Sequence, residues 1–420
     1  MEIGFALTQH CNLRCPHCIR DDVTTVQSLS VDLLASILEQ SRVLFGPHSV
    51  SFTGGEPLLH PEFGRVVDLL AEHGHPYRFV SNGWHLTRAL KHLDRHTPSA
   101  VRLSLSGATA EVHDAERGRG SFHRVLLASG VLTSRGIPTH LSLVIDSRTR
   151  GQLREAADLA ESIGAHELHY ILPQPVAASV MRDSDLALEE WDDVRDAIDA
   201  LAAEGRAHVR IVRDYGFPFD GAERPCTTKA RTRLFVDAWG RLVSCCQLSD
   251  YGFNDAEVVT DLHVTPLADA LAAFHAHVDR LIEASAPRSD ALAERFPCMR
   301  CARANGKLRW LSEHAGSPWA PAAVEPTHQL TEFRVTIPSE VLAAHLGDEA
   351  VLLDLSAKRY YRLNESAAVV YRALEEGEGR DGAIRRLTDA FDVSASDAAS
   401  AVDALLDDLT ARRLVARPVE

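Results

Sequence analysis

Features typical of membrane and secreted proteins are missing from this 420-residue sequence. It contains no apolar run of about 18 residues or more, and its start, MEIGFALTQHCNLRC, lacks a basic stretch followed by an apolar one. The eight cysteines are too few for a secreted disulfide scaffold of this length, and they occur in clusters. We therefore expect a cytoplasmic protein with reduced thiols and no membrane partner.

An excess of basic charge is also absent, because 44 Lys and Arg stand against 59 Asp and Glu, for a net charge of −15. This charge gives the chain no overall attraction to nucleic acid or anionic lipid. There is no internal repeat, and 45% hydrophobic with 25% charged residues is ordinary for a globular protein. At roughly 150 residues per domain, the length predicts two or three domains.

The first half of the chain alternates short apolar runs, rich in β-branched residues, with longer stretches of helical period. Six such units predict a parallel α/β sheet, either a partial barrel or an open sheet, because parallel neighbours need a crossover element. The predicted strands are 3–8, 49–53, 77–81, 101–105, 139–145 and 167–171. The predicted helices are 30–45, 61–73, 85–95, 121–135, 150–163 and 186–204.

The pattern changes twice after this region. Residues 206–315 combine apolar runs, a turn at Trp239–Gly240 and a helix near 265–284. Three prolines then predict a linker at 316–330, because proline interrupts regular hydrogen bonding. The runs FRVTIP, EAVLLDL and KRYYRL, followed by helical patterns at 364–376, 382–391 and 396–411, predict a small α+β domain at 331–420.

Three cysteines, Cys11, Cys15 and Cys18, follow the first predicted strand. A structural zinc site needs four ligands, so zinc would require His10, His17 or a distant residue as well. An iron–sulfur cubane has four irons, and three thiolates leave one of them open. The loop lies at the carboxyl end of its strand, where barrel enzymes carry their chemistry.

Further motifs follow the next strands, namely Gly54-Gly55-Glu56-Pro57, then Asn82-Gly83, then LSLSGATAEVHDAERGRGSF. Together with C-x3-C-x2-C, they resemble the radical SAM superfamily, whose open iron is chelated by S-adenosylmethionine (SAM). The resemblance implies a (β/α)6 partial TIM barrel over 1–205. It also implies one-electron reduction of a 4Fe–4S cluster by an external donor such as flavodoxin or ferredoxin, cleavage of SAM, and abstraction of a substrate hydrogen atom.

The same resemblance assigns residues to the cofactors. The cluster would be held by Cys11, Cys15 and Cys18, with His17 at the position usually occupied by Tyr or Phe. Ser106 stands where the family usually has Asp, so it receives no role. The residues placed near SAM are His17, Gly54, Gly55, Glu56, Pro57, Asn82, Ser104 and Arg117.

A second cysteine set follows at Cys226, Cys245, Cys298 and Cys301. Its C-x18-C spacing, with Gly240 five residues before Cys245, resembles the SPASM and twitch domains, and four cysteines suffice for one auxiliary iron–sulfur cluster in a shorter, twitch-like form. Zinc is the alternative, because four cysteines in this pattern also suit a zinc site. Cys246 remains as a buried thiol, a hydrogen donor or an alternate ligand.

The last domain resembles the PqqD-like peptide-recognition domain, known as the RiPP recognition element, over 331–416. The resemblance implies a winged-helix-like fold in which a leader peptide adds as a strand at the edge 358–363. A DNA-binding winged helix is the alternative, but this segment is acidic overall. The basic residues would be explained equally well by a solvent-exposed edge strand whose positive charges prevent pairing with other chains. The predicted peptide-binding residues are Lys358, Arg359, Tyr360, Tyr361, Arg362 and Leu363.

These features predict a radical SAM enzyme that modifies a ribosomally made precursor peptide, most consistently by an oxidative thioether, carbon–carbon or ether cross-link. The alternatives are a peptide epimerase with Cys246 as hydrogen donor, a small-molecule radical SAM dehydrogenase, and a non-catalytic zinc-and-peptide adaptor. The 21 histidines show no spacing that selects a metal, so we interpret them as surface or core residues. The precursor, the modified residue and the oligomeric state do not follow from the sequence.

Overall fold

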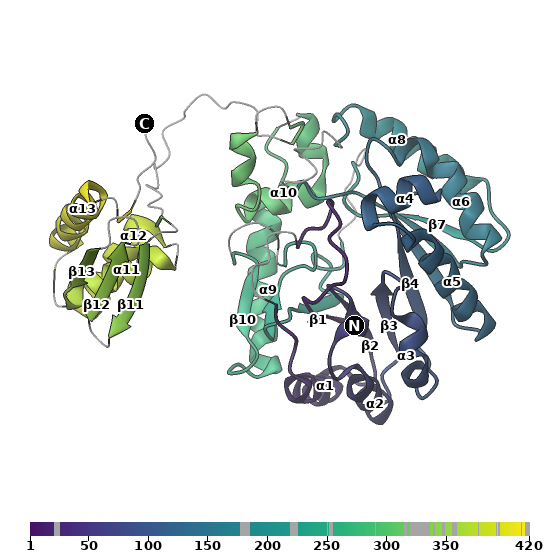
Figure 1. Cartoon of the computed structure of the whole chain (residues 1–420), viewed down its shortest axis with the longest axis horizontal. Coiled ribbons are helices and arrows are strands. Elements are labelled where there is room, and N and C mark those ends of the chain that lie inside the picture. Colours follow the sequence, from purple (N-terminus) through teal and green to yellow (C-terminus); the bar gives the residue numbers. More distant parts are fainter. Residues whose placement is uncertain are drawn as a thin grey trace. The chain divides into compact units, whose positions relative to one another are not determined.

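The computed structural model divides into two compact units, Met1–Ala322 and Ala323–Glu420 (Figure 1). The predicted linker at 316–330 lies outside the described residues apart from 317–319. The predicted boundary at 205 stays a prediction. The structure describes residues 1–20, 26–176, 185–218, 226–249, 251, 255–289, 291–314, 317–319, 337–338, 341–346, 349–354, 359–376, 378–391, 393, 395–412 and 414–415.

The first unit is built on one ten-stranded sheet with the order β10-β9-β8-β1-β2-β3-β4-β5-β6-β7. The strands from β8 to β7 pair in parallel, whereas β9 and β10 are antiparallel. The parallel core comprises β1 (Glu2–Thr8), β2 (Ser49–Gly54), β3 (Tyr77–Ser81), β4 (Ala100–Leu105), β5 (Thr139–Val144) and β6 (Glu167–Ile171). It is flanked by β7 (Arg210–Arg213), β8 (Arg233–Val236), β9 (Arg241–Val243) and β10 (Val258–Asp261).

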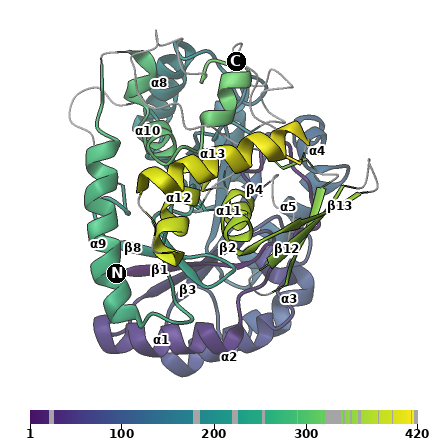
Figure 2. The same ribbon diagram turned by 90° about the vertical axis from the view of Figure 1, so that its left-hand side faces the viewer.

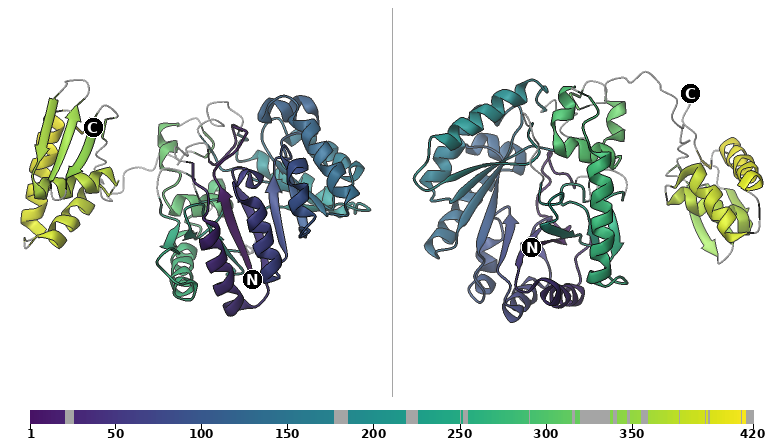
Figure 3. Two further views of the ribbon diagram at one scale, coloured as in Figure 1. Left: turned by 60° about the horizontal axis from the view of Figure 1, so that its bottom comes forward. Right: turned by 180° about the vertical axis from the view of Figure 1, so that it is seen from behind.

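Helices alternate with the core strands and cover the outer face of the sheet (Figure 3). The six predicted helices are confirmed, and one more, α4 (Ala110–Arg117), was not predicted because its sequence AEVHDAER has no clear apolar period. Thr109 caps the start of α4, and Gly118 follows its end with φ +90°. The others are α1 (Val31–Phe45), α2 (Phe63–His73), α3 (Leu86–Leu93), α5 (Ser121–Ser134), α6 (Leu153–Ser162) and α8 (Glu190–Ala203).

Alternation along the strands gives the sheet two different faces. On β2, Val50 and Phe52 are fully buried in the main apolar core, while Ser51 and Thr53 point to the opposite side. Inward side chains from β2, β3, β4, β5 and β8 line one common cavity, so the sheet curls around a lumen. This is the predicted partial-barrel α/β architecture.

The segment after β7 extends the same sheet rather than forming a second one, because β8 pairs in parallel with β1. The turn predicted at Trp239–Gly240 is confirmed, with Gly240 at φ +82° and its N–H donating to the carbonyl of Asp237 at 3.1 Å. The long helix α9 (Leu267–Ala284) runs beside β10 (Figure 1). It is followed by α10 (Pro297–Ala304), and Figure 2 shows both helices. Short 3-10 helices occupy Pro57–Leu59, Arg150–Gln152, Leu292–Arg295 and Arg309–Glu313.

The described residues of the second unit form a three-stranded antiparallel sheet followed by three helices, as predicted. Most of the predicted strand FRVTIP lies outside the described residues, and the structure has its first strand at β11 (Val341–Leu346) instead. No helix among the described residues of the chain is long and apolar enough to cross a membrane. The remaining elements are β12 (Glu349–Asp354), β13 (Arg359–Leu363), α11 (Glu365–Glu375), α12 (Gly379–Ala390) and α13 (Ala395–Ala411).

Candidate functional site

The loops that follow β1, β2, β3 and β4 meet at one edge of the sheet, because these four strands are parallel neighbours. The three-cysteine loop follows β1, Gly54–Pro57 ends β2, and Asn82 follows β3. Arg117 ends helix α4, which follows β4. We call these four segments the rim. The structure therefore gathers on one edge the residues that the sequence motifs singled out.

The two rim glycines are needed for close backbone packing. A Cβ added to Gly54 would lie 2.3 Å from the carbonyl oxygen of Thr8, and one added to Gly55 would lie 2.2 Å from that of His10. Gly55 N–H donates to the carbonyl of Thr8 at 2.6 Å, and Glu56 N–H donates to that of His10 at 2.7 Å. The two glycines thus allow the backbone after β2 to pack directly against the base of the cysteine loop.

Glu56 ties the β2 loop to the end of β3. Its buried carboxylate accepts hydrogen bonds from the Ser81 hydroxyl at 3.0 Å and from the backbone N–H of Asn82 at 2.8 Å. The Asn82 amide then donates to Asn12 at 3.0 Å and lies 3.9 Å from the sulfur of Cys11. Glu56 therefore positions Asn82 against the cysteine loop.

Replacing Glu56 by glutamine should change how stability depends on pH. Burial raises the pKa of Glu56 from 4.5 to about 7, despite the hydrogen bonds that it accepts. The folded protein then binds this proton more tightly than the unfolded chain, so stability falls as pH rises from about 4.5 to 7, by roughly 3 kcal/mol. Urea unfolding from pH 4.5 to 8 should show that Glu56→Gln removes this decline.

The exposed Glu62 offers a matched control, since Glu62→Gln should leave the pH profile of the wild-type protein unchanged. Parallel profiles for the wild-type protein and Glu56→Gln would contradict the assigned burial effect.

His17 and Arg117 belong to one polar network at the rim. His17 Nδ1 lies 3.1 Å from the Glu116 carboxylate, and Arg117 Nη2 lies 3.4 Å from His17 Nε2. Although burial would raise it, hydrogen bonds from His17 and Arg148 lower the pKa of Glu116 to about 2. Arg117 Nε also donates to the Ser106 hydroxyl at 2.6 Å. The network holds Arg117 beside the cysteine loop.

Sequence reasoning gave no role to Ser106, Glu116 or Arg148. Ser106 and Glu116 lie within the quoted stretch LSLSGATAEVHDAERGRGSF, so proximity to Arg117 could have suggested them. Arg148 follows a different strand, and only the fold brings it to Glu116. Ser104 lies on β4 between the buried Leu103 and Leu105, which places its side chain on the lumen face. Pro57 begins a 3-10 helix at the end of the glycine loop.

The cysteines of the rim loop are all free thiols, as are the other five. Cys18 N–H donates to the carbonyl of Cys15 at 3.0 Å, which turns the loop. Burial raises the pKa of Cys15 to about 11, with Arg117 acting in the opposite direction. The thiol of Cys15 is therefore protonated near pH 7, and a metal that binds it as a thiolate must displace that proton.

Four thiols gather in a second pocket, about 480 Å³ in volume, which is lined by Cys226, Cys245, Cys298 and Cys301. Cys298 and Cys301 lie one turn apart on α10, and Cys245 follows β9. The Thr228 hydroxyl donates to the carbonyl of Ser244 at 2.9 Å and so joins the Cys226 and Cys245 segments. Burial raises the pKa of Cys298 well above its usual range. A buried set of four soft donors suits an iron–sulfur cluster or zinc.

Cys246 does not line this pocket, although it adjoins Cys245. It packs beside Ala6, Phe235 and Val243, on the lumen side of the sheet. Its thiol hydrogen-bonds with the thiol of Cys245, which lowers the pKa of Cys246, and the positive charge of Arg233 acts in the same direction. Cys246 thus contacts a cysteine of the pocket without lining the pocket itself, and its function stays a prediction.

Of the predicted peptide-binding residues, Arg359–Leu363 form strand β13, which pairs only with β12 among the described residues and leaves an edge open. Tyr360 and Arg362 are exposed, Leu363 is buried, and Tyr361 contacts Arg412 at the end of α13 through a cation–π distance of 5.7 Å. Lys358 lies outside the described residues. The open edge and the last helix are therefore neighbours, as the peptide-binding hypothesis requires.

Known families match both units. Residues 5–160 match the radical SAM superfamily, and residues 349–415 match coenzyme PQQ synthesis protein D (PqqD). The chain carries a radical SAM domain and a PqqD domain. The rim cysteines and both glycine motifs fall within the radical SAM match. All of β13 and the helices α11, α12 and α13 fall within the PqqD match.

Curated proteins and solved structures are similar to parts of the chain. Mycofactocin maturase MftC of Mycobacterium tuberculosis is 32% identical over 203 residues, which cover 47% of this chain and 49% of the relative. The chain thus matches about half the length of such curated relatives. Streptococcus suis SuiB bound to S-adenosylmethionine superposes with a TM-score of 0.54 at 15% identity, covering 64% of each chain. Native anSMEcpe with bound AdoMet also gives 0.54 at 15% identity, covering 74% of this chain and 97% of the other. These two structures confirm the radical SAM fold.

Proposed function

We propose that the protein is a radical SAM enzyme that modifies a ribosomally made precursor peptide, by oxidative formation of a thioether, carbon–carbon or ether cross-link. One observation carries this proposal: a single chain joins a radical SAM rim with three free thiols, a second pocket with four thiols, and a PqqD domain. The mycobacterial relative is a maturase by name, and the PqqD match supports the choice of a peptide substrate.

The rim residues fit the cofactors that this family uses. Cys11, Cys15 and Cys18 would hold a 4Fe–4S cluster, and when SAM is bound to it the pair supplies a carbon radical that removes hydrogen from a substrate. Glu56 and Asn82 brace the cysteine loop, while the Glu116 network holds Arg117 as a cation beside the thiols. A carboxylate of SAM would be the natural partner of that cation. An external electron donor such as flavodoxin or ferredoxin belongs to the same proposal.

The four-cysteine pocket favours an oxidative reaction. Cross-linking removes two hydrogen atoms from the peptide, so one electron must leave the substrate after the first hydrogen atom is taken. An auxiliary iron–sulfur cluster held by the pocket thiols would supply the electron acceptor that such chemistry needs. Zinc in the same pocket could not accept an electron, because Zn²⁺ has no redox chemistry.

The PqqD unit would bind the leader part of the precursor. A leader strand added to β13 gains backbone hydrogen bonds, and side-chain contacts give specificity. The outward side chains Leu342, Leu353 and Tyr360 lie in one cross-strand row, with Leu342 51% and Tyr360 74% exposed. This row offers an apolar surface beside the cations of the edge.

Reversing the charge of Arg362 should weaken leader binding. Arg362 is exposed and forms two contacts with Glu349, so Arg362→Glu places two carboxylates together and repels acidic leader residues. We expect the Kd of a fluorescent leader peptide, measured by anisotropy, to rise roughly tenfold. Arg385→Glu changes the same charge at an exposed position of α12 and should leave Kd unchanged. Equal Kd values for the wild-type protein and Arg362→Glu would remove β13 from the proposed interface.

A peptide epimerase is the second candidate, and the position of Cys246 favours it. This thiol lies on the lumen side, outside the four-cysteine pocket, where it could return a hydrogen atom to a substrate radical. Such a reaction leaves the peptide mass unchanged in ordinary water.

Mass spectrometry of the precursor separates the two reactions. After anaerobic reconstitution, the purified protein should be brown and should cleave SAM when reduced. Cross-linking lowers the precursor mass by about 2 Da, whereas epimerisation in heavy water adds about one deuterium. We expect a short reading frame beside the gene to encode the precursor. A colourless protein with stoichiometric zinc and no SAM cleavage would overturn the proposed enzyme.

A further inference from the structure

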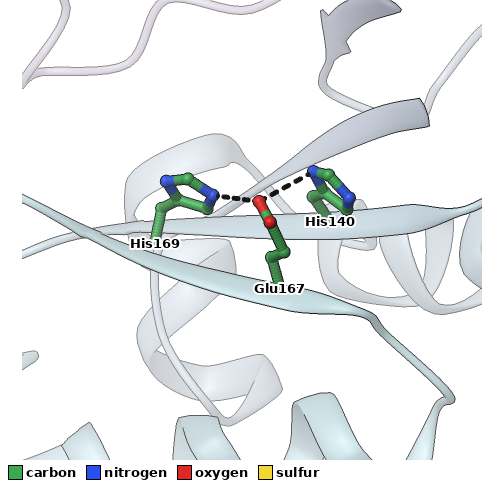
Figure 4. A group of neighbouring side chains, drawn as sticks. All are labelled: His140, Glu167 and His169. Carbon is green, nitrogen blue, oxygen red and sulfur yellow. Dashed lines mark hydrogen bonds and ion pairs between the residues drawn. The ribbon is translucent and has the colours of Figure 1, made fainter. Parts of the chain in front are cut away.

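Two histidines and a glutamate come together inside the barrel, although their spacing in the sequence suggested no site. His140 on β5 and Glu167 and His169 on β6 place their donor atoms within 4.8 Å of one another. Figure 4 shows both imidazole rings turned toward one carboxylate oxygen of Glu167. His169 Nε2 lies 2.6 Å and His140 Nδ1 lies 3.2 Å from that oxygen.

Guanidinium groups approach two of the residues that a metal ion would need as ligands. Arg102 Nη2 lies 3.0 Å from His169 Nε2, the same ring nitrogen that faces Glu167. Arg210 also pairs with Glu167. Burial lowers the pKa of both imidazoles to about 4, so they are neutral near pH 7 and the local charge comes from the arginines. The positive charge around the two histidines therefore disfavours binding of a metal cation and favours binding of an anion.

Three arginines, Arg78, Arg102 and Arg233, line an adjoining lumen cavity of about 400 Å³, to which no described Asp or Glu contributes. Ser51 and His140 also line it. This cationic interior contrasts with the net charge of −15 for the whole chain. A ligand that enters the cavity meets several hydrogen-bond donors, and the Glu2 carboxylate competes for two of them, Arg78 and Arg233.

The three arginines differ in how they are neutralised. Arg78 and Arg233 share the Glu2 carboxylate, and Arg233 also donates to the Ser51 hydroxyl at 3.0 Å. Gly4 leaves room for this arrangement, because a Cβ there would lie 2.8 Å from Arg233 Nη2. Arg102 has no carboxylate within 4 Å among the described residues, and its Nε is buried without a hydrogen-bond partner.

An unpaired guanidinium in a partly buried site is costly unless an anion accepts its hydrogen bonds. Burial and the neighbouring Arg78 lower the pKa of Arg102 only to about 10, so the group stays charged near pH 7. The contact with neutral His169 orients the guanidinium but does not neutralise it. Arg102 is thus a charged donor held in place for a partner that the chain itself does not provide.

We propose that Arg78, Arg102 and Arg233 bind a carboxylate group of the peptide substrate inside the barrel lumen. This inference rests on the proposed function for the identity of the substrate, since carboxylates are the anions that an unmodified peptide carries. The three arginines lie near the amino-terminal ends of β3, β4 and β8, whereas the rim lies at the carboxyl ends. Thr53, which directly precedes Gly54, lines the same cavity, so the bound carboxylate would hold the peptide in the lumen beneath the rim. The anchor would select which residue reaches the rim.

Anion binding by the full-length protein tests this site without any turnover. Calorimetric titration with citrate should show binding to the wild-type protein, and Arg102→Gln should weaken it roughly 10- to 100-fold, the effect of losing charged hydrogen bonds. Arg210→Gln is the matched control, because Arg210 is exposed and does not line the cavity, and it should bind citrate normally. Absence of citrate binding, equal binding by Arg102→Gln, or tighter binding of inorganic phosphate than citrate would overturn the carboxylate site.

Thermal unfolding distinguishes a binding residue from a structural one. Without citrate, Arg102→Gln should unfold at the wild-type temperature or higher, because it removes an unpaired charge, whereas Glu2→Gln should lower the Tm by unpairing Arg78 and Arg233. A Tm loss for Arg102→Gln equal to that for Glu2→Gln would show a structural role and contradict the proposal.

Peptide variants then identify the source of the carboxylate. Two variants of a precursor that the enzyme modifies test the two sources: one has an amidated C-terminus, and the other has its core Asp and Glu replaced by Asn and Gln. The variant that lacks the bound carboxylate should have a KM roughly 10- to 100-fold higher, with a smaller effect on kcat. Arg102→Gln should abolish that difference. If the protein binds citrate through Arg102 but modifies no peptide, the proposed function is wrong and the anion site stands. If Arg102→Gln modifies the precursor with normal kinetics, the proposed function stands and the carboxylate site is wrong.

Discussion

Replacing Cys15 by alanine should abolish SAM cleavage and lower the iron content of the anaerobically reconstituted protein by about four atoms per chain. The rim loop offers three thiols, Cys11, Cys15 and Cys18, so loss of one leaves too few ligands to hold a cubane. Iron and sulfide analysis, together with chromatography of 5′-deoxyadenosine, measures both effects. Leader binding should persist, because the PqqD domain belongs to the other compact unit.

Cys246→Ala is the matched control for this experiment, because Cys246 lies outside both cysteine sets. It should retain the full iron content and the cleavage of SAM. If Cys15→Ala kept its iron and its cleavage activity, the rim loop would not be the site of the catalytic cluster.

Replacing Cys298 and Cys301 by alanine should separate SAM cleavage from peptide modification. These thiols lie one turn apart on α10 and contribute half of the ligands in the second pocket. Their loss should remove the auxiliary cluster, so the double variant should still cleave SAM but should yield no cross-linked peptide. Iron analysis, 5′-deoxyadenosine release and peptide mass spectrometry measure the three quantities in one preparation.

Three other outcomes of that experiment would each contradict one part of the proposal: the role of the second pocket, its metal, or the type of reaction. Full peptide modification by the double variant would show that the second pocket has no part in the reaction. Unchanged iron with loss of one zinc per chain would identify the pocket as a zinc site. A product of unchanged mass that carries deuterium would favour the epimerase.

The core of the fold could be predicted because its pattern is local. Each of β1 to β6 is a short apolar run and each predicted helix between them has a clear period, so the parallel sheet could be predicted from the alternation. Helix α4 was missed because capping by Thr109 and Gly118, rather than an apolar face, defines it. The attachment of β7 to β6 and of β8 to β1 could not be predicted, because it depends on contacts distant in sequence.

The candidate site was predictable to the extent that its residues follow neighbouring strands. Motif spacing brought the rim cysteines, Glu56, Asn82 and Arg117 to attention, and the structure gathers them at one edge. Their functions as ligands remain predictions. The glycine pair has a packing reason that the motif did not reveal, namely contact with the carbonyls of Thr8 and His10.

The lumen cluster was invisible in the sequence for a physical reason. Arg78, Arg102 and Arg233 stand on three strands and have no common spacing, so only the curl of the sheet brings them to one cavity. His140 and His169 were interpreted as ordinary surface or core residues. The structure instead places both beside Glu167, and His169 beside Arg102 as well.

Mössbauer spectroscopy of the anaerobic, ⁵⁷Fe-reconstituted protein tests the central claim most directly. If the rim thiols leave one iron of the cubane open, SAM should change the signal of a single iron in that cluster, and Cys298→Ala/Cys301→Ala should show the same change. A spectrum that SAM leaves unaltered, or a reconstituted protein that contains no iron, would contradict the account.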